Sequence, residues 1–207
     1  MIKPRLKMLI FVFSMILFAG FVHALVINEI MYDPAGTDSG HEWVELFNEQ
    51  TSVDMTGFRF YEGGSAHSLT LIQGSGTLPA GSYAIITDDA DQFLLDFPSF
   101  SGTLFDSTWS SLSNTGELLE MRDASDLVMD SVFYNSSWGG ASNYTLELID
   151  ASLDNNASTS WLESTENGGT PGYLNSVSSQ APEFSLLTAL FTFTCCILVF
   201  FAVRRRY

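Results

Sequence analysis

The sequence predicts an all-β domain, an antiparallel sandwich, set between two apolar terminal segments. From residue 25 the apolar residues come in short runs separated by turn-forming residues, and no window has a long apolar stripe with the helical period. Seven or eight short strands joined by Gly-rich turns favour two packed antiparallel sheets. The expected strands span residues 26–31, 42–47, 57–61, 68–72, 82–87, 117–122, 127–134 and 144–149, and residues 90–96 fit one helical turn.

The first 24 residues have the pattern of a secretory signal peptide. Lys3, Arg5 and Lys7 precede an uncharged run that ends near Val22, and Ala24 supplies a small residue where a signal peptidase cleaves. An uncleaved anchor is the alternative, because the apolar run could continue into the first strand. In both cases the chain from residue 25 is expected outside the cytoplasm.

The C-terminal end has the pattern of a membrane anchor. Residues 184–203 carry no charge and are long enough to cross a bilayer as a helix. Residues 204–207 form a basic tail, which the positive-inside rule places in the cytoplasm. Residues 176–183 are the expected linker, so residues 25–175 form a domain held close to the cell surface.

The charge of the exported part is strongly acidic. The chain has 24 acidic and eight basic residues, and only Arg59 and Arg122 among the basic ones lie outside the two terminal segments. Such a surface repels nucleic acid and suits basic partners, divalent cations or solubility in high salt. The two cysteines, Cys195 and Cys196, lie in the apolar C-terminal segment, so the domain contains no disulfide.

Two glutamates interrupt the first two apolar strands. Glu29 lies between Ile27 and Met31, and Glu45 lies between Trp43 and Phe47. Strand alternation places each of them on the same face as its large apolar neighbours. A buried carboxylate requires a partner, so we interpret both as structural carboxylates held by arginine, backbone N–H groups or a metal.

Acidic residues in two loops are candidate ligands for Ca²⁺, which prefers hard oxygen ligands. Their spacing does not match an EF-hand loop, and solvated turn residues are the alternative. Apart from calcium the sequence predicts no cofactor. The candidate ligands are Asp33, Asp38 and Glu42 in the first loop and Asp88, Asp89 and Asp91 after the fifth expected strand.

The sequence predicts no enzyme. His41 and His67 are the only histidines after the signal segment, and neither belongs to an HExxH motif. A nucleophile elbow is also absent. Three N-x-S/T sequons, at Asn135, Asn143 and Asn156, are candidate glycosylation sites in an exported domain.

Several segments together resemble the lamin tail domain family. The resemblance extends in order over residues 25–175, and it implies an immunoglobulin-like sandwich that serves as a structural or binding module without a shared active site. The segments that carry the resemblance are VINEI (26–30), EWVELFN (42–48), VDMTGF (53–58), LPAGSYAII (78–86), LSNTGELL (112–119), DLVMDSV (126–132) and TPGYLN (170–175).

The C-terminus carries a second resemblance. The tripeptide Pro182, Glu183 and Phe184, followed by the apolar run and an arginine cluster, is similar to the archaeal PEF-CTERM sorting signal. This resemblance implies an archaeal source and cleavage by a sortase-like membrane enzyme. A plain single-pass anchor is the alternative.

Together these patterns predict a non-enzymatic cell-surface module, anchored in the membrane, with a structural role or an unknown protein or glycan ligand. Two other functions stay open at this point. One is a calcium-dependent adhesin, and the other is an accessory module of an extracellular hydrolase system.

Overall fold

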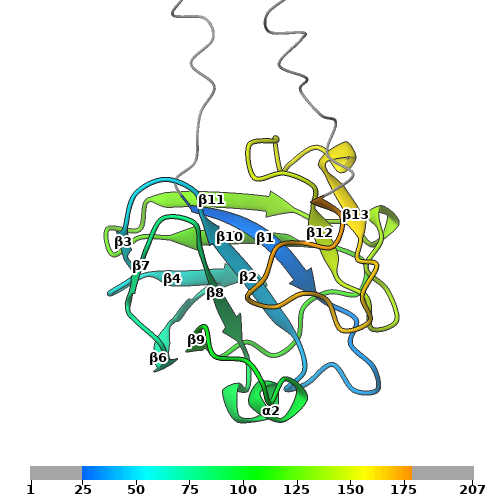
Figure 1. The fold of residues 1–207 in the computed structure, drawn as a ribbon, viewed down its shortest axis with the longest axis horizontal. Coiled ribbons are helices and arrows are strands. Elements are labelled where there is room, and N and C mark those ends of the chain that lie inside the picture. Colours follow the sequence, from blue (N-terminus) through cyan, green and yellow to red (C-terminus); the bar gives the residue numbers. More distant parts are fainter. Residues whose placement is uncertain (1–24, 179–207) are drawn as a thin grey trace, which may run out of the picture.

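The computed structural model describes residues 25–178 (Figure 1). Four expected features lie outside the described residues: the signal peptide at 1–24, the sorting tripeptide Pro182, Glu183 and Phe184, the membrane anchor at 184–203 and the basic tail at 204–207. Within residues 25–178 no helix is long and apolar enough to cross a membrane.

Two main β-sheets form the domain, with a small third one at their edge. The seven-stranded sheet has the order β13 (Trp161–Glu163), β12 (Leu146–Leu148), β1 (Leu25–Met31), β2 (Trp43–Asn48), β8 (Ser82–Thr87), β9 (Thr103–Asp106) and β6 (Thr70–Gln73). The four-stranded sheet has the order β11 (Val128–Phe133), β10 (Leu118–Arg122), β4 (Arg59–Glu62) and β5 (Ser65–Ser68). The small sheet pairs β3 (Val53–Asp54) with β7 (Thr77–Leu78), and the helices found within residues 25–178 are α2 (Ala90–Asp96), η1 (Ser136–Trp138) and η2 (Ser158–Ser160).

The mostly-β sandwich expected from the sequence is confirmed, and each expected strand overlaps a strand of the structure. The segment expected as one strand at residues 68–72 is divided between β5 and β6, which belong to different sheets. The short strands β3, β7, β9 and β13 were not expected. They are two to four residues long, too short to show an apolar alternation.

One pair of strands departs from the expected antiparallel arrangement. Strands β8 and β9 are parallel, whereas the other paired strands are antiparallel. A parallel pair requires a crossover connection, which is usually helical, and α2 provides it. Asp89 begins this helix because its side chain accepts a hydrogen bond from the backbone N–H of Gln92. The buried residues Ala90 and Phe93 then hold α2 against the sheet.

The main core lies between the two large sheets. It contains 23 buried residues that extend from β1 and β2 to β4, β10 and β11. A smaller core on the outer face of the seven-stranded sheet is covered by α2, and it includes Met31, Trp43, Ile85 and Phe93. The seven-stranded sheet is therefore apolar on both faces beside α2.

A β-bulge in β1 decides which residues face outward. The pairing register with β2 shifts between Ile27 and Glu29, so the intervening Asn28 is the extra residue. The backbone N–H of Ile27 donates to Asp130 of β11 at 2.7 Å. Because of the bulge, Ile27 belongs to the inner core while Met31 lies on the outer face, and the expected common face of Ile27, Glu29 and Met31 does not form.

The rest of the outer face is covered by residues 165–178, here called the C-terminal segment. In Figure 1 it is the orange chain that leaves β13 and passes across the sheet near β1 and β2. Val177 is fully buried, and both Ser176 and Val177 donate hydrogen bonds to Glu147. The folded part therefore extends beyond Asn175, into the residues expected as a linker.

Candidate functional site

Three buried glutamates form a row across adjacent strands on the outer face. Glu29 of β1 lies opposite Glu45 of β2 on one side and opposite Glu147 of β12 on the other. All three are fully buried. We call this row the glutamate row; the C-terminal segment covers it.

Glu29, at the centre of the row, is held by two threonines. Its Oε1 accepts from the Thr145 hydroxyl at 2.6 Å and from the Thr170 backbone N–H at 2.8 Å, and its Oε2 contacts the Thr170 hydroxyl at 3.1 Å. Neither Arg59 nor Arg122 takes part, because Arg59 pairs with Asp126 and Arg122 pairs with Glu120 and Asp126. The sequence suggested arginine, backbone N–H groups or a metal as partners. The Glu29 carboxylate binds one backbone N–H group and two threonine hydroxyl groups.

Glu45 binds the C-terminal segment at a second point. Its Oε1 accepts from the Asn28 side-chain amide at 2.7 Å, and its Oε2 accepts from the Gly172 backbone N–H at 2.6 Å. The same Asn28 amide donates to Asn175, whose own amide donates to the backbone carbonyls of Asn28 and Leu148. These bonds satisfy the buried amide groups between the segment and the sheet.

Glu147 holds the end of the segment. Its Oε2 accepts from the Ser176 hydroxyl at 2.7 Å and from the Val177 backbone N–H at 3.0 Å, while its Oε1 lies 3.1 Å from the Thr170 hydroxyl. Sequence reasoning did not single out Glu147. The pattern of an acidic residue between Leu146 and Leu148 repeats the pattern around Glu45, and it is the signal that could have found it.

Burial changes the acidity of this row. Desolvation, followed by repulsion from the Glu147 carboxylate, raises the pKa of Glu29 to about 8. Desolvation and the neighbouring Glu29 raise the pKa of Glu45 well above its ordinary value. At neutral pH the row therefore retains at least one proton. Because all three carboxyl groups are closed off from solvent, the arrangement fits a structural role and not contact with a substrate.

We expect the melting temperature to fall as pH rises from 6 to 9. In the unfolded chain Glu29 loses its proton near 4.5, whereas in the folded domain it keeps it up to about 8. Between these values the folded state binds more protons, so its stability decreases as pH rises, by at most about 1.4 kcal/mol per pH unit for one proton. Melting curves at several pH values measure this slope.

Glu29→Gln is the matched variant, since its amide oxygen can accept both bonds now made to Oε1. It should flatten the slope, whereas Glu166→Gln, which changes an exposed carboxylate of the C-terminal segment, should not. Equal slopes in all three proteins would contradict the assignment to Glu29.

Five of the six candidate calcium ligands accept hydrogen bonds within the fold. Asp33 accepts from the Ser142 N–H, Asp38 accepts from the Asn114 amide, and Asp88 accepts from the Gly40 N–H. Among residues 25–178 no three acidic, histidine or cysteine side chains gather in a group that could hold a metal ion. The remaining candidates are Asp89, which caps α2, Asp91, which is exposed in its first turn, and Glu42, which is buried.

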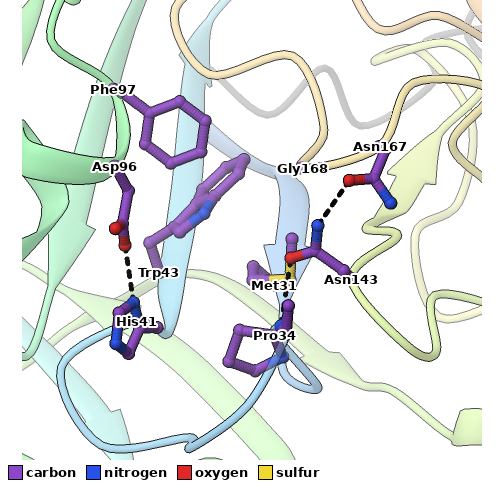
Figure 2. A pocket seen from close by; sticks show the side chains of 10 residues that line it. Met31, Pro34, His41, Trp43, Asp96, Phe97, Asn143, Asn167 and Gly168 are labelled. Atoms are coloured by element: carbon purple, nitrogen blue, oxygen red, sulfur yellow. Dashed lines mark hydrogen bonds and ion pairs between the residues drawn. The ribbon is translucent and has the colours of Figure 1, made fainter.

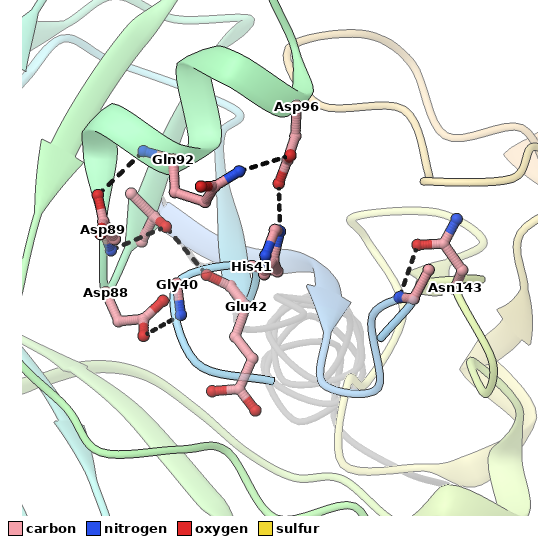
Figure 3. A network of polar contacts seen from close by, with 10 residues as sticks. Gly40, His41, Glu42, Asp88, Asp89, Gln92, Asp96 and Asn143 are labelled. Carbon is pink, nitrogen blue, oxygen red and sulfur yellow. Dashed lines mark hydrogen bonds and ion pairs between the residues drawn. The ribbon is translucent and has the colours of Figure 1, made fainter. Parts of the chain in front are cut away.

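Glu42 holds a different loop. Its carboxylate accepts from the Leu112 N–H at 2.8 Å, from the Trp109 indole at 3.2 Å and from the Ser111 hydroxyl at 3.2 Å. Burial is the main cause that raises the pKa of Glu42 to about 7. Figure 3 shows this side chain pointing away from α2, so it does not join the acidic residues of the helix.

A polar network ties the loop between β1 and β2 to α2 (Figure 3). Asp88 binds the loop at Gly40, and Asp96 accepts from Gln92 at 2.9 Å and contacts His41 Nδ1 at 2.6 Å. This network fixes the loop beside the end of the helix.

A pocket of about 350 Å³ opens next to this network (Figure 2). Its apolar wall includes Met31, Pro34, Trp43 and Phe97. Its polar lining comes from His41, Asp96, Asn143 and Asn167. None of these eight residues was singled out as a pocket residue from the sequence, because they come from four separate parts of the chain.

The three sequon asparagines use their amide groups within the fold. Asn135 caps η1, Asn156 donates to the Ser131 carbonyl, and Asn143 donates to Asn167 at 2.6 Å. The hydroxyl of Thr145, which completes the sequon of Asn143, is buried against Glu29. Glycosylation at Asn143 would therefore have to precede folding.

Two packed sheets whose buried carboxylates hold loops and a terminal segment define an immunoglobulin-like structural domain. The family model of the Lamin Tail Domain matches residues 22–136, and the chain belongs to this family. The family is not one of known enzymes. The match ends before β12, so Glu147 and the C-terminal segment lie beyond it. No curated protein and no solved structure matches the chain.

Proposed function

We propose that the protein is a non-enzymatic cell-surface module with a binding or structural role, and that the apolar run at residues 184–203 anchors it in the membrane with the domain outside. The observation that supports a non-enzymatic role is the glutamate row. Its oxygens are bonded to Thr170, Gly172, Ser176 and Val177 of the C-terminal segment, and the row is closed to solvent.

The location is supported by the sequence of the two ends. A basic and apolar stretch at 1–24 precedes the domain, and the uncharged run at 184–203 ends in three arginines. The strongly acidic composition of the part between them suits a basic partner. Because the tripeptide Pro182, Glu183 and Phe184 precedes this run, we also propose that a sortase-like membrane enzyme cleaves the chain there and transfers the domain to a new anchor.

The test is fractionation of the native cells combined with intact-mass analysis. Protease added to intact cells should remove the domain, and the protein should sediment with the membranes. The mass should lack residues 1–24, and it reports whether residues from 184 onward and any glycans are present. A full-length protein in the cytoplasmic fraction would overturn the proposal.

Calcium is expected to leave the stability unchanged. The carboxylates of Asp33, Asp88, Asp89 and Glu42 already accept hydrogen bonds from backbone N–H groups, and a bound cation would have to compete with these bonds. Melting temperatures in millimolar Ca²⁺ and in chelator should agree. A clear rise with Ca²⁺ would instead favour the calcium-dependent adhesin.

A further inference from the structure

The pocket beside α2 has the chemistry of a site for a cation. The residues that line it include one carboxylate, Asp96, and neither lysine nor arginine. The two arginines of residues 25–178 are paired with acidic side chains on the four-stranded sheet and its turn. Apart from the His41 ring, which contacts Asp96, the lining offers no basic group to an anionic ligand.

Asp96 has acceptor capacity left. Its Oδ1 accepts from Gln92 and its Oδ2 contacts His41. A carboxylate has about four acceptor sites, so these two bonds leave room for further donors. The side chain is 32% exposed, which lets a ligand reach it. The bonds to His41 and Gln92 also hold it in place before a ligand arrives.

The rest of the pocket suits an apolar stem. Trp43 and Phe97 stand edge to face, with ring centroids 6.0 Å apart, and Met31 and Pro34 continue the wall. Figure 2 shows these side chains between the His41–Asp96 pair on one side and the Asn143–Asn167 pair on the other. A chain of methylene groups that ends in a charged donor matches an apolar wall with a carboxylate at its edge.

The Trp43 indole carries a donor without an acceptor. Its Nε1 is buried in the structure without a hydrogen-bond partner, although a buried indole N–H normally has one. Because this nitrogen is closed to solvent while Trp43 lines the pocket, a carbonyl group of a ligand reaches it only if the indole ring turns toward the pocket.

We infer that the pocket binds a lysine side chain of a basic partner protein, with the ammonium group at Asp96 and the stem against Trp43 and Phe97. The stretch from residue 25 to 178 has 23 acidic residues and no lysine, so the domain cannot supply this group itself. The volume of about 350 Å³ lies in the range of small-ligand sites and leaves space for the adjoining peptide. The inference rests on the binding role proposed above.

The test uses the full chain in detergent and three probes: Nα-acetyl-lysine methylamide, its norleucine analogue and 1,5-diaminopentane. Calorimetry should show binding of the lysine compound and at least tenfold weaker binding of norleucine, which lacks only the ammonium group. Asp96→Asn should weaken binding of the lysine compound at least tenfold. Asp91→Asn, on the same helix but outside the pocket, should not. Melting curves verify that both variants are folded.

Equal binding of the norleucine analogue, an unchanged affinity in Asp96→Asn, or no binding of the lysine compound at 10 mM would each overturn the inference. Binding of the free diamine without the lysine compound would overturn the assignment to a protein partner. None of these results bears on where the protein resides, which fractionation tests separately.

Discussion

Asn175→Asp is expected to destabilise the domain by about 3 kcal/mol or more, although the two side chains have the same shape. The Asn175 amide donates to the carbonyls of Asn28 and Leu148, and both bonds are buried. An ionised aspartate would place a negative oxygen against the two carbonyl oxygens, and each buried group left without a partner costs about 1–3 kcal/mol. Equilibrium unfolding in urea measures the loss.

Asn167→Asp is the matched control in the same segment. Asn167 is exposed and accepts a hydrogen bond from Asn143 through its oxygen, and aspartate keeps that acceptor. The change should stay within about 0.5 kcal/mol, as for most surface substitutions. If both variants lost the same stability, Asn175 would not be what holds the C-terminal segment to the sheet.

Gly169→Ala is expected to have an effect of similar size, about 3 kcal/mol or more. Gly169 has φ +78°, and a Cβ atom there would overlap Glu29 Oε1 and lie 2.8 Å from the Thr145 hydroxyl oxygen. Both neighbours are buried and bonded to each other, so neither can move without breaking the centre of the glutamate row. Thermal and urea unfolding should both show the loss.

The adjacent Gly168 separates crowding from backbone strain. It has φ +86°, but the nearest atom to its Cβ position is on Phe97, at 3.8 Å. Gly168→Ala should therefore lower the stability only by the cost of holding an alanine in the left-handed backbone conformation, which is about 1 kcal/mol. A Gly169→Ala variant no less stable than Gly168→Ala would show that the segment does not approach Glu29 as closely as described.

The strands could be predicted because their signal is local. Residues 82–87 hold a short apolar run between turn formers, and the structure gives β8 the same bounds; residues 90–96 likewise form α2. The parallel pairing of β8 with β9 could not be predicted in this way. It depends on where the chain lies after the crossover, and Thr103–Asp106 is too short to show a pattern.

The sequence by itself determined that Glu29 and Glu45 are buried, because each stands within a short apolar strand and strand alternation is a local property. Only the tertiary structure decided what holds them. Thr170 lies 141 positions from Glu29, and Gly172 lies 127 positions from Glu45. A bulge at Asn28 turns the Glu29 carboxyl group to the outer face, where it lies beside Glu45 under the C-terminal segment. A carboxylate that is closed off from water is stable only where hydrogen-bond donors reach it. Here the donors come from residues far along the chain, so their identity depends on how the whole chain packs.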